Sequence, residues 1–573
     1  MSWLYWYIKY KQAPRDPRKA VGSAMANLDS SVVDVYALNV VASPNDVAKF
    51  ITYTMGSLMT QDDWASIFNM SKGNPDNLAS ILNSPNISTD RVVGILNSPN
   101  ISFNRVVGIL NSPNISANKA AAILNNLLVD KAAAILNDVN MSASRAALIL
   151  NDANLPVSKV ALILNDANMS VSKAAAILND TNLSADKVAA ILNDTSISVS
   201  RVASILNDTN ISASRAAAIL MSLNISVDKI YSILKDVGLS ADKTQAILYN
   251  MLFSERLVNI LTYGASNLTV SSNTTISGVN RYGTLTVNSG VTLTVDGQPA
   301  ALIAKSISVS GAIAKTPTGG AGGVGYCGNS GGKGGGGLII FAWSLVNSGV
   351  ISADGSNGGT PGSCAYTFGD GGAGGGGAFM VVGDDTFGGG GGGGYGDISG
   401  GGGGGAGGGG RRTSFSGGNG GSATATKFSS YADLAEIVKK AIIDWFIKNV
   451  LGKSPSSTKT LNVYGAGGGG GGTSSDTNGG GGGGQGGEII CLCGSFNNTG
   501  TIRANGGAGG ASTTSTSTYS YAGGGGGGGG GVVYILYKTL VSQGTLSASG
   551  GPGSPGPYYG YAGGAGTAKA VAI

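Results

Sequence analysis

Apolar residues recur along residues 81–261 in Ile-Leu pairs that stand 14 residues apart. The pairs begin at Ile81, Ile95, Ile109, Ile123, Ile135, Ile149, Ile163, Ile177, Ile191, Ile205, Ile219, Ile233, Ile247 and Ile260. The unit is shortened by two residues before Ile135 and by one before Ile260. A fixed period of this kind is typical of a solenoid, in which each repeat packs against its neighbours.

Each unit predicts one short helix. In the unit that contains Ile191, Ser184 has the side chain of a good N-cap. Leu183 and Val188 flank this cap with the spacing of a hydrophobic staple. Val188, Ile191 and Leu192 then share one helix face. Helices of about ten residues are marginal alone, so stacking must stabilise them.

Charged residues in these units run against the helix dipole. Cations stand near the helix starts, at Arg91, Arg105, Lys119, Lys131, Arg145, Lys159, Lys173, Lys187, Arg201, Arg215, Lys229 and Lys243. Anions stand near many helix ends, at Asp138, Asp152, Asp166, Asp180, Asp194 and Asp208. Two interpretations stay open: a charge ladder in which neighbouring repeats pair, and a basic stripe that holds an acidic partner.

The hydrophobic period changes to that of β-strands near Ala265. Residues 284–297 read as two short strands joined by an Asn-Ser-Gly turn. A strand–turn–strand unit then recurs at residues 337–355, 487–506 and 531–550. Three copies of one design predict a repetitive β architecture.

Glycine runs lie between these copies, at Gly388–Gly394, Gly400–Gly405, Gly467–Gly472 and Gly523–Gly531. Because the runs accompany the strand units, we favour a bundle of polyglycine II helices over a flexible linker. Such helices resemble polyproline II and bond only to their neighbours, which requires close approach of the chains. One amphipathic helix, predicted over 429–452, interrupts this region and is expected to cover an open face of the β core.

Composition excludes several classes of function. The chain of 573 residues has a net charge of +5, which is too small to indicate nucleic acid. It has no histidine, so the commonest general base and metal ligand is missing. We expect no catalysis, no cofactor and no metal. A glycan-cleaving enzyme would need two facing carboxylates. Nothing in the spacing of Asp370, Asp384, Asp385 and Asp397 selects such a pair.

Cysteines and sequons give weaker signals. Cys327 and Cys364 lie in glycine-rich stretches and could form a disulfide outside the cell. Cys491 and Cys493 alternate on a strand and read as buried apolar residues. Glycosylation sequons begin at Asn86, Asn100, Asn114, Asn140, Asn168, Asn182, Asn210 and Asn224. The alternative reading is that Asn serves the turn and Ser the cap, which produces the same triplet.

The N-terminal residues are aromatic and carry no pattern of a signal peptide or membrane span. Trp3, Tyr5, Trp6 and Tyr7 are candidates for an anchor that docks on a partner or a membrane interface. The other interpretation is an ordinary buried first element. We expect an anchor at 1–42, a helical solenoid at 43–264, a short β domain at 265–318 and a glycine-rich tip at 319–573.

This combination of helical repeats and glycine runs beside strand units resembles receptor-binding tail fibres of viruses, especially of spindle-shaped and other viruses of hyperthermophilic archaea. The glycine half is similar to polyglycine II tips of phage adhesins. The resemblance implies attachment of a virion to a host surface glycan or glycoprotein. Aromatic side chains between the glycine runs are then the receptor-binding candidates: Tyr366, Phe368, Tyr519, Tyr521, Tyr558, Tyr559 and Tyr561.

The sequence as a whole predicts a multidomain protein with an all-α solenoid of 14-residue repeats, followed by repetitive β structure with a polyglycine II bundle and one inserted helix. We expect it at the tail end of a virion. Its N-terminus would bind other tail or capsid proteins, and an oligomer is compatible with this role. The alternative function is a cellular surface adhesin, or a pilus or surface-layer-associated protein.

Overall fold

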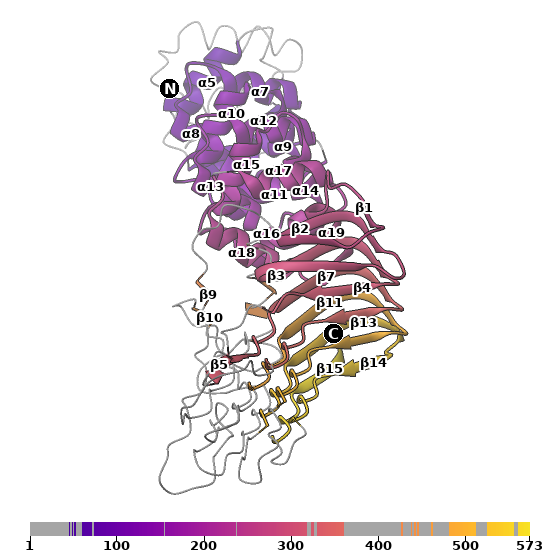
Figure 1. Ribbon diagram of the computed structural model, residues 1–573. Helices are drawn as coiled ribbons and strands as arrows, with labels where there is room; N and C mark the ends of the chain where they lie inside the picture. The colour runs from indigo at the N-terminus through magenta and orange to yellow at the C-terminus, as the bar shows by residue number, and fades with distance from the viewer. Residues whose placement is uncertain are drawn as a thin grey trace, which may run out of the picture. The chain divides into compact units, whose positions relative to one another are not determined.

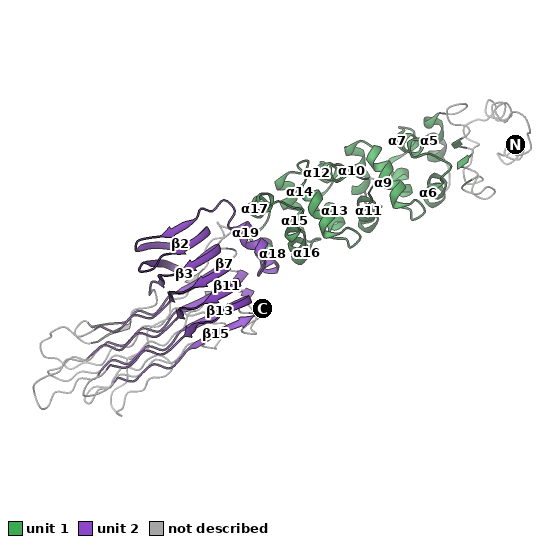
Figure 2. Cartoon of the chain, turned by 90° about the vertical axis from the view of Figure 1, so that its right-hand side faces the viewer, with its two compact units in different colours: residues 1–243 green, residues 244–573 purple. Residues whose placement is uncertain are grey.

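The chain divides into two compact units, residues 1–243 and 244–573 (Figure 2). The computed structural model describes residues 45, 48–49, 51–52, 60–70, 74–153, 155–236, 238–317, 322–325, 329–359, 426–427, 437, 441–442, 444–445, 448, 460–461, 481–511, 524–554 and 560–573. Within these residues, no helix has the length and apolar character that crossing a membrane requires.

Each 14-residue unit forms one helix of about three turns (Figure 1). The helices are α5 Gln61–Met70, α6 Pro75–Asn83, α7 Thr89–Asn97, α8 Phe103–Asn111, α9 Ala117–Asn126, α10 Val129–Asn137, α11 Ala143–Leu150, α12 Val157–Asn165, α13 Val171–Asn179, α14 Ala185–Asn193, α15 Val199–Asn207, α16 Ala213–Met221, α17 Val227–Lys235, α18 Ala241–Met251 and α19 Glu255–Leu261. The predicted cap is confirmed in α14, where the Ser184 side chain accepts a hydrogen bond from the Lys187 amide.

Helices two units apart stack on one another, so α11 packs against α9 and α13, and α12 against α10 and α14. One coil of the array therefore contains two helices, and the structural repeat spans two sequence units. The Ile-Leu pair and the residues two and three positions before its Ile supply the core, as Val188, Ala189, Ile191 and Leu192 do in α14. Alanine at these positions lets the short helices approach closely.

The cations at the helix starts bind main-chain carbonyl groups of earlier units. The donors are Arg91, Arg105, Lys119, Lys131, Arg145, Lys159, Lys173, Arg201, Arg215, Lys229 and Lys243, and their acceptors lie 30–39 residues earlier. Lys173, for example, donates to the carbonyl oxygens of Asp138, at 3.0 Å, and Met141. The start of its own helix repels each cation, and carbonyl groups near the end of another helix stabilise it instead.

The charge-ladder hypothesis is confirmed in part, because burial lowers the pKa of Lys173 and of Lys243 while the nearby charges of Asp138 and Asp208 oppose that shift. The hydrogen bonds of the aspartates, however, go to other groups. Asp180 accepts a hydrogen bond from the Ser144 hydroxyl at 2.6 Å, two helices earlier, and binds Asn182 within its own turn. Burial alone would raise the pKa of Asp180, but these hydrogen bonds outweigh it and hold the pKa below its usual value. The cations donate their hydrogen bonds to main-chain carbonyl groups. A pattern of side chains in the sequence does not reveal these acceptors.

Replacing Lys173 with methionine is expected to destabilise the helical unit by about 1–2 kcal/mol, because two partly buried hydrogen bonds from a charged donor to carbonyl oxygens are lost. Thermal unfolding of the full chain measures the change. Lys235→Met is the matched control, since this exposed lysine only lies near the Tyr231 ring, 5.2 Å from its centroid. Equal stability of Lys173→Met and the parent would show that the carbonyl contacts contribute nothing.

The second unit contains a large parallel sheet whose described strands form two rows. Its strands are β1 Leu268–Val270, β2 Thr274–Val287, β3 Thr292–Val309, β4 Ala312–Lys315, β7 Gly337–Asn347, β8 Val350–Ser352, β11 Glu488–Asn498, β12 Thr501–Arg503, β13 Val532–Ser542, β14 Thr545–Ser547 and β15 Thr567–Ala572. The long-strand row runs β2-β3-β7-β11-β13-β15, and the short-strand row runs β3-β4-β8-β12-β14. Separate two-stranded pairs join β5 Gly322–Gly325 to β6 Asn329–Gly331, and β9 Thr426–Lys427 to β10 Thr460–Leu461.

The three strand–turn–strand copies form β7–β8, β11–β12 and β13–β14, as the sequence predicts. Because all pairs between copies are parallel, each copy lies in register on the next. The space between the rows is filled by side chains such as Leu345, Phe496 and Ile502. Cys491 and Cys493 are free thiols in this core, which confirms their reading as buried apolar residues.

The predicted helix 429–452 is helical at Ile437, Ala441, Ile442, Asp444, Trp445 and Lys448, the positions that the structure describes there. Its described contacts are with α18 and the residues after it. Trp445 packs edge-on against Phe253 with ring centroids 4.5 Å apart, and Lys448 lies 5.8 Å from the centroid of Tyr249. Asp444 accepts a hydrogen bond from Gln245. The contacts given for this segment are therefore with a helix and the residues after it, and its covering of the β core stays a prediction.

The observed architecture is a helical array followed by a large parallel sheet. The described glycine segments, such as 481–487 and 524–531, are assigned neither helix nor strand. A polyglycine II bundle is therefore not part of the observed fold and stays a prediction. The glycine runs 388–394, 400–405 and 467–472 lie outside the described residues.

Candidate functional site

The described glycine segments lie alongside one another through main-chain hydrogen bonds that repeat every third residue. Gly483 and Gly486 both donate to the next coil, to Gly526 and Gly529, at 2.9 Å. Gly484 instead donates to Ser356 in a different neighbouring segment, also at 2.9 Å. Successive residues of one segment therefore bond to different neighbours, which satisfies the main chain where no sheet is present.

Glycine is required here because the segments touch through their backbones. A Cβ atom on Gly507 would lie 2.1 Å from the Ser356 carbonyl oxygen. A Cβ atom on Gly484 would lie 2.0 Å from the Lys333 carbonyl oxygen. Neither oxygen can move without displacing a main chain, so any larger residue would separate the segments.

One series of main-chain hydrogen bonds runs across several described glycine segments. It joins Gly481 to Gly359, Gly510 to Gly481, Gly525 to Gly510, Ser554 to Gly525 and Gly560 to Ser554, at 2.7–3.2 Å. Segments far apart in the sequence are therefore held together at this level.

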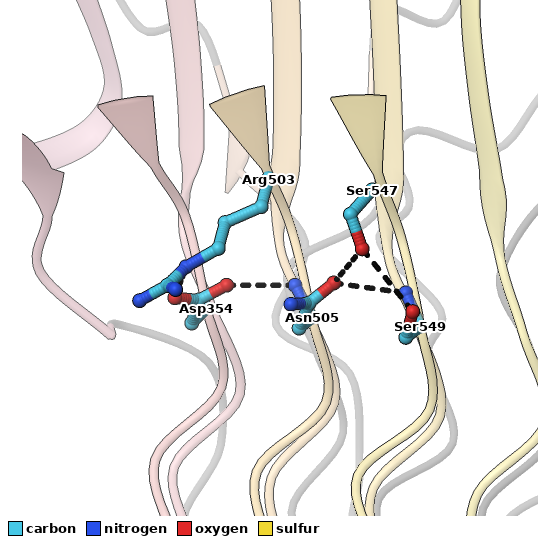
Figure 3. A network of polar contacts seen from close by, with 5 residues as sticks. All are labelled: Asp354, Arg503, Asn505, Ser547 and Ser549. Atoms are coloured by element: carbon cyan, nitrogen blue, oxygen red, sulfur yellow. Dashed lines mark hydrogen bonds and ion pairs between the residues drawn. The ribbon is translucent and has the colours of Figure 1, made fainter. Parts of the chain in front are cut away.

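A polar network ties the outgoing segments together just after the short strands (Figure 3). The Asp354 carboxylate accepts from the Arg503 side chain at 2.7 Å and from the Asn505 amide at 2.8 Å. The Asn505 side-chain oxygen accepts in turn from the Ser547 hydroxyl, at 2.8 Å, and from the Ser549 amide, at 2.9 Å. Equivalent residues of three coils thus fix the segments where the strands end.

Among the described residues of this unit, the two side chains that are charged in water at neutral pH and are nevertheless buried are Glu488 and Lys315. Burial raises the pKa of Glu488, at the start of β11, to about 8. Gln485, three residues earlier, is fully buried, and its side-chain nitrogen and oxygen have no hydrogen-bond partner among the residues that the structure describes. Burial lowers the pKa of Lys315 to about 8 despite the opposing effect of Asp296. A neutral acid at Glu488 is therefore the form that the folded chain favours near neutral pH.

Of the predicted receptor-binding residues, Tyr561 is described and has 62% of its surface exposed. Its carbonyl accepts from Gly527 at 2.8 Å, so the main chain is held while the ring faces solvent. Tyr366, Phe368, Tyr519, Tyr521, Tyr558 and Tyr559 lie outside the described residues.

The anchor candidates Trp3, Tyr5, Trp6 and Tyr7 lie outside the described residues, as do the disulfide candidates Cys327 and Cys364. The sequon asparagines are described, and all except the half-buried Asn86 are exposed. Their amide groups serve the turns: Asn140, Asn168, Asn182 and Asn210 each donate to the aspartate two residues earlier, at 2.8–3.0 Å. Turn formation thus accounts for these asparagines, and their glycosylation stays a prediction.

Aligning the three strand copies would have revealed the polar network that the sequence analysis missed. The copies contain Ser-Ala-Asp-Gly355, Arg-Ala-Asn-Gly506 and Ser-Ala-Ser-Gly550, which place Asp354, Asn505 and Ser549 at one position. Comparison of the chain with protein families, curated proteins and solved structures found no match.

Proposed function

We propose that the protein is an attachment fibre of a virion, whose helical array carries a glycine-rich unit that binds the host surface. The observation that supports this most is the exposed ring of Tyr561, 62% of whose surface faces solvent while its main chain is bonded to the glycine segment at Gly527. Side chains held on a rigid scaffold are suited to binding. The receptor would be a surface glycan or glycoprotein.

For the glycine segments, the proposal includes a polyglycine II arrangement. Its support is the three-residue period of the hydrogen bonds and the backbone contacts that exclude a Cβ atom. Among the described residues, the glycines with a left-handed backbone are Gly264, Gly278, Gly290, Gly297 and Gly544, all outside these segments. A bundle of this kind would form a stiff base with few side chains, so binding would depend on the loops.

The helical array would serve as the spacer between this unit and the particle. Stacking of the helices from α7 to α17 on the helix two units earlier supports that role, because repeats of one kind extend in a single direction. The aromatic N-terminal residues would then dock on other tail or capsid proteins. This part of the proposal rests on the sequence pattern alone.

Replacing Tyr558, Tyr559 and Tyr561 together with alanine is expected to weaken binding of the purified chain to host cells roughly tenfold or more. The reason is that tyrosine buries a large flat surface at low entropic cost. Flow cytometry with fluorescently labelled protein measures the binding. Tyr263→Ala is the control, because Tyr263 is 46% exposed and follows α19, away from the glycine segments in sequence. Unchanged binding by the triple variant, with unchanged thermal unfolding, would remove these tyrosines from the receptor site.

A further inference from the structure

In the long-strand row, the alternation of inward and outward residues is interrupted at the same place in successive strands. In β3, β7 and β11, every second residue faces the core until one point in each strand. At that point two consecutive residues separate one core residue from the next. In β7 these are Trp343 and Ser344, which stand between the buried residues Ala342 and Leu345. The corresponding residues are Lys305 and Ser306 in β3, Gly494 and Ser495 in β11, and Lys538 and Thr539 in β13.

Hydroxyl side chains form a continuous series at this position, here called the hydroxyl ladder. Register pairs Thr284 with Ser306, Ser306 with Ser344, Ser344 with Ser495 and Ser495 with Thr539, on the adjacent strands β2, β3, β7, β11 and β13 (Figure 1). Neighbouring strands lie about 4.8 Å apart, which sets the spacing of the ladder. All five residues are partly or fully exposed, and within the described residues none of their hydroxyl groups has a hydrogen-bond partner.

An aromatic ring lies beside the ladder. A Cβ atom on Gly494 would be 2.4 Å from the Trp343 ring, so glycine at this position lets the indole lie across the next strand. The Lys538 ammonium group lies 5.9 Å from the centroid of the same ring. Trp343 keeps part of its surface exposed, although a residue with this much apolar area is usually buried.

The charged residues beside the ladder are both cations. Lys305 and Lys538 are exposed on either side of Trp343. In the five strands that carry the ladder, no acidic residue occupies a ladder position or the position before it. The face therefore combines hydroxyl groups that donate and accept, a flat apolar ring and two cations.

We propose that the hydroxyl ladder, together with Trp343, Lys305 and Lys538, binds an extended acidic polysaccharide that runs across the strands. Sugar hydroxyl groups would exchange hydrogen bonds with the ladder, and the apolar side of a sugar ring would pack on the indole. Carboxylate groups of the polysaccharide would pair with the two lysines.

This inference deepens the proposed attachment role and rests on it for its biological purpose, but it names a surface distinct from the tyrosine loops. The polysaccharide-binding proposal and the attachment proposal can therefore be refuted independently of each other. Binding of a soluble polysaccharide tests the ladder without cells, whereas binding to host cells tests attachment.

The experiment measures binding of the full chain to polygalacturonate, an acidic polymer, and to dextran, a neutral one, by isothermal titration calorimetry. We expect polygalacturonate to bind and dextran to bind at least tenfold more weakly. Trp343→Ala is expected to weaken polygalacturonate binding at least tenfold. The paired changes Lys305→Gln and Lys538→Gln should weaken it by a similar factor and remove the preference over dextran.

Two further variants keep the test decisive. Ser344→Ala with Ser495→Ala changes only two small surface groups and should still weaken binding several-fold. Ser352→Ala is the matched control, because this partly exposed serine lies in the short-strand row, and its binding should equal that of the parent. No detectable binding of polygalacturonate by the correctly folded parent would overturn the proposal, as would equal binding by the parent and the Ser344/Ser495 variant. The tyrosine triple variant should retain polygalacturonate binding while losing attachment to cells.

Discussion

Replacing Gly528 with alanine is expected to unfold the glycine-rich unit or to destabilise it by more than about 4 kcal/mol, which is exceptional for a single substitution. The added Cβ atom would lie 2.0 Å from the Gly484 carbonyl oxygen and 2.5 Å from its carbon. Both atoms belong to a main chain that is itself bonded on other sides, since Gly484 donates to Ser356. No side-chain rotation can therefore relieve the overlap.

Differential scanning calorimetry of the full chain measures this effect. Gly108→Ala is the control, because its Cβ atom would meet only the Pro75 ring, at 3.1 Å, in a helix that favours alanine. We expect the control to change stability by less than about 1 kcal/mol. A Gly528→Ala variant as stable as its parent would mean that the glycine segments do not approach as closely as described.

Replacing Glu488 with glutamine is expected to stabilise the protein at neutral pH. It should also make the free energy of unfolding depend much less on pH. Burial raises the pKa of this carboxyl group from 4.5 to about 8. Between these values the folded chain keeps a proton that the unfolded chain has released. The contribution to stability is therefore fully present below pH 4.5 and is lost as the pH rises to about 8. The loss is on the order of several kcal/mol, given 1.36 kcal/mol per pKa unit.

Urea unfolding at several pH values between 4.5 and 8 tests this expectation, since the raised pKa of Glu488 confines its effect to this window. Lys315, whose pKa is lowered from 10.5 to about 8, changes stability only above that range, where stability rises with pH. Glu255→Gln controls for the loss of one acidic side chain, because Glu255 is exposed at the start of α19. Parallel pH profiles for Glu488→Gln and the parent would contradict the buried neutral acid.

Local structure followed from the sequence where one short segment determines it. The cap at Ser184, the paired apolar positions Leu183 and Val188, and the end of the helix at Asn193 all appear as the pattern predicts. The 14-residue unit contains these determinants in full. The stacking of α14 on α12 was not predicted, because a single period does not state how many helices form one coil.

Contacts between residues that are distant in sequence were harder to predict. Lys173 binds carbonyl groups more than 30 residues earlier, and main-chain acceptors leave no trace in a side-chain pattern. The hydroxyl ladder joins Ser344 to Ser495, which are brought together only by parallel register. A signal nevertheless existed. Aligning Trp-Ser-Leu345, Gly-Ser-Phe496 and Lys-Thr-Leu540 from the three strand copies places the hydroxyl groups in one column.

The location of the glycine-rich unit on a particle is the most direct test of the attachment role. Immunogold electron microscopy, with an antibody against residues 319–573, would be applied to particles and cells from the culture that produces the protein. The proposed function predicts gold at the end of a virus particle, away from its body. Gold on the envelopes of uninfected cells, with none on particles, would contradict it and indicate a cellular adhesin.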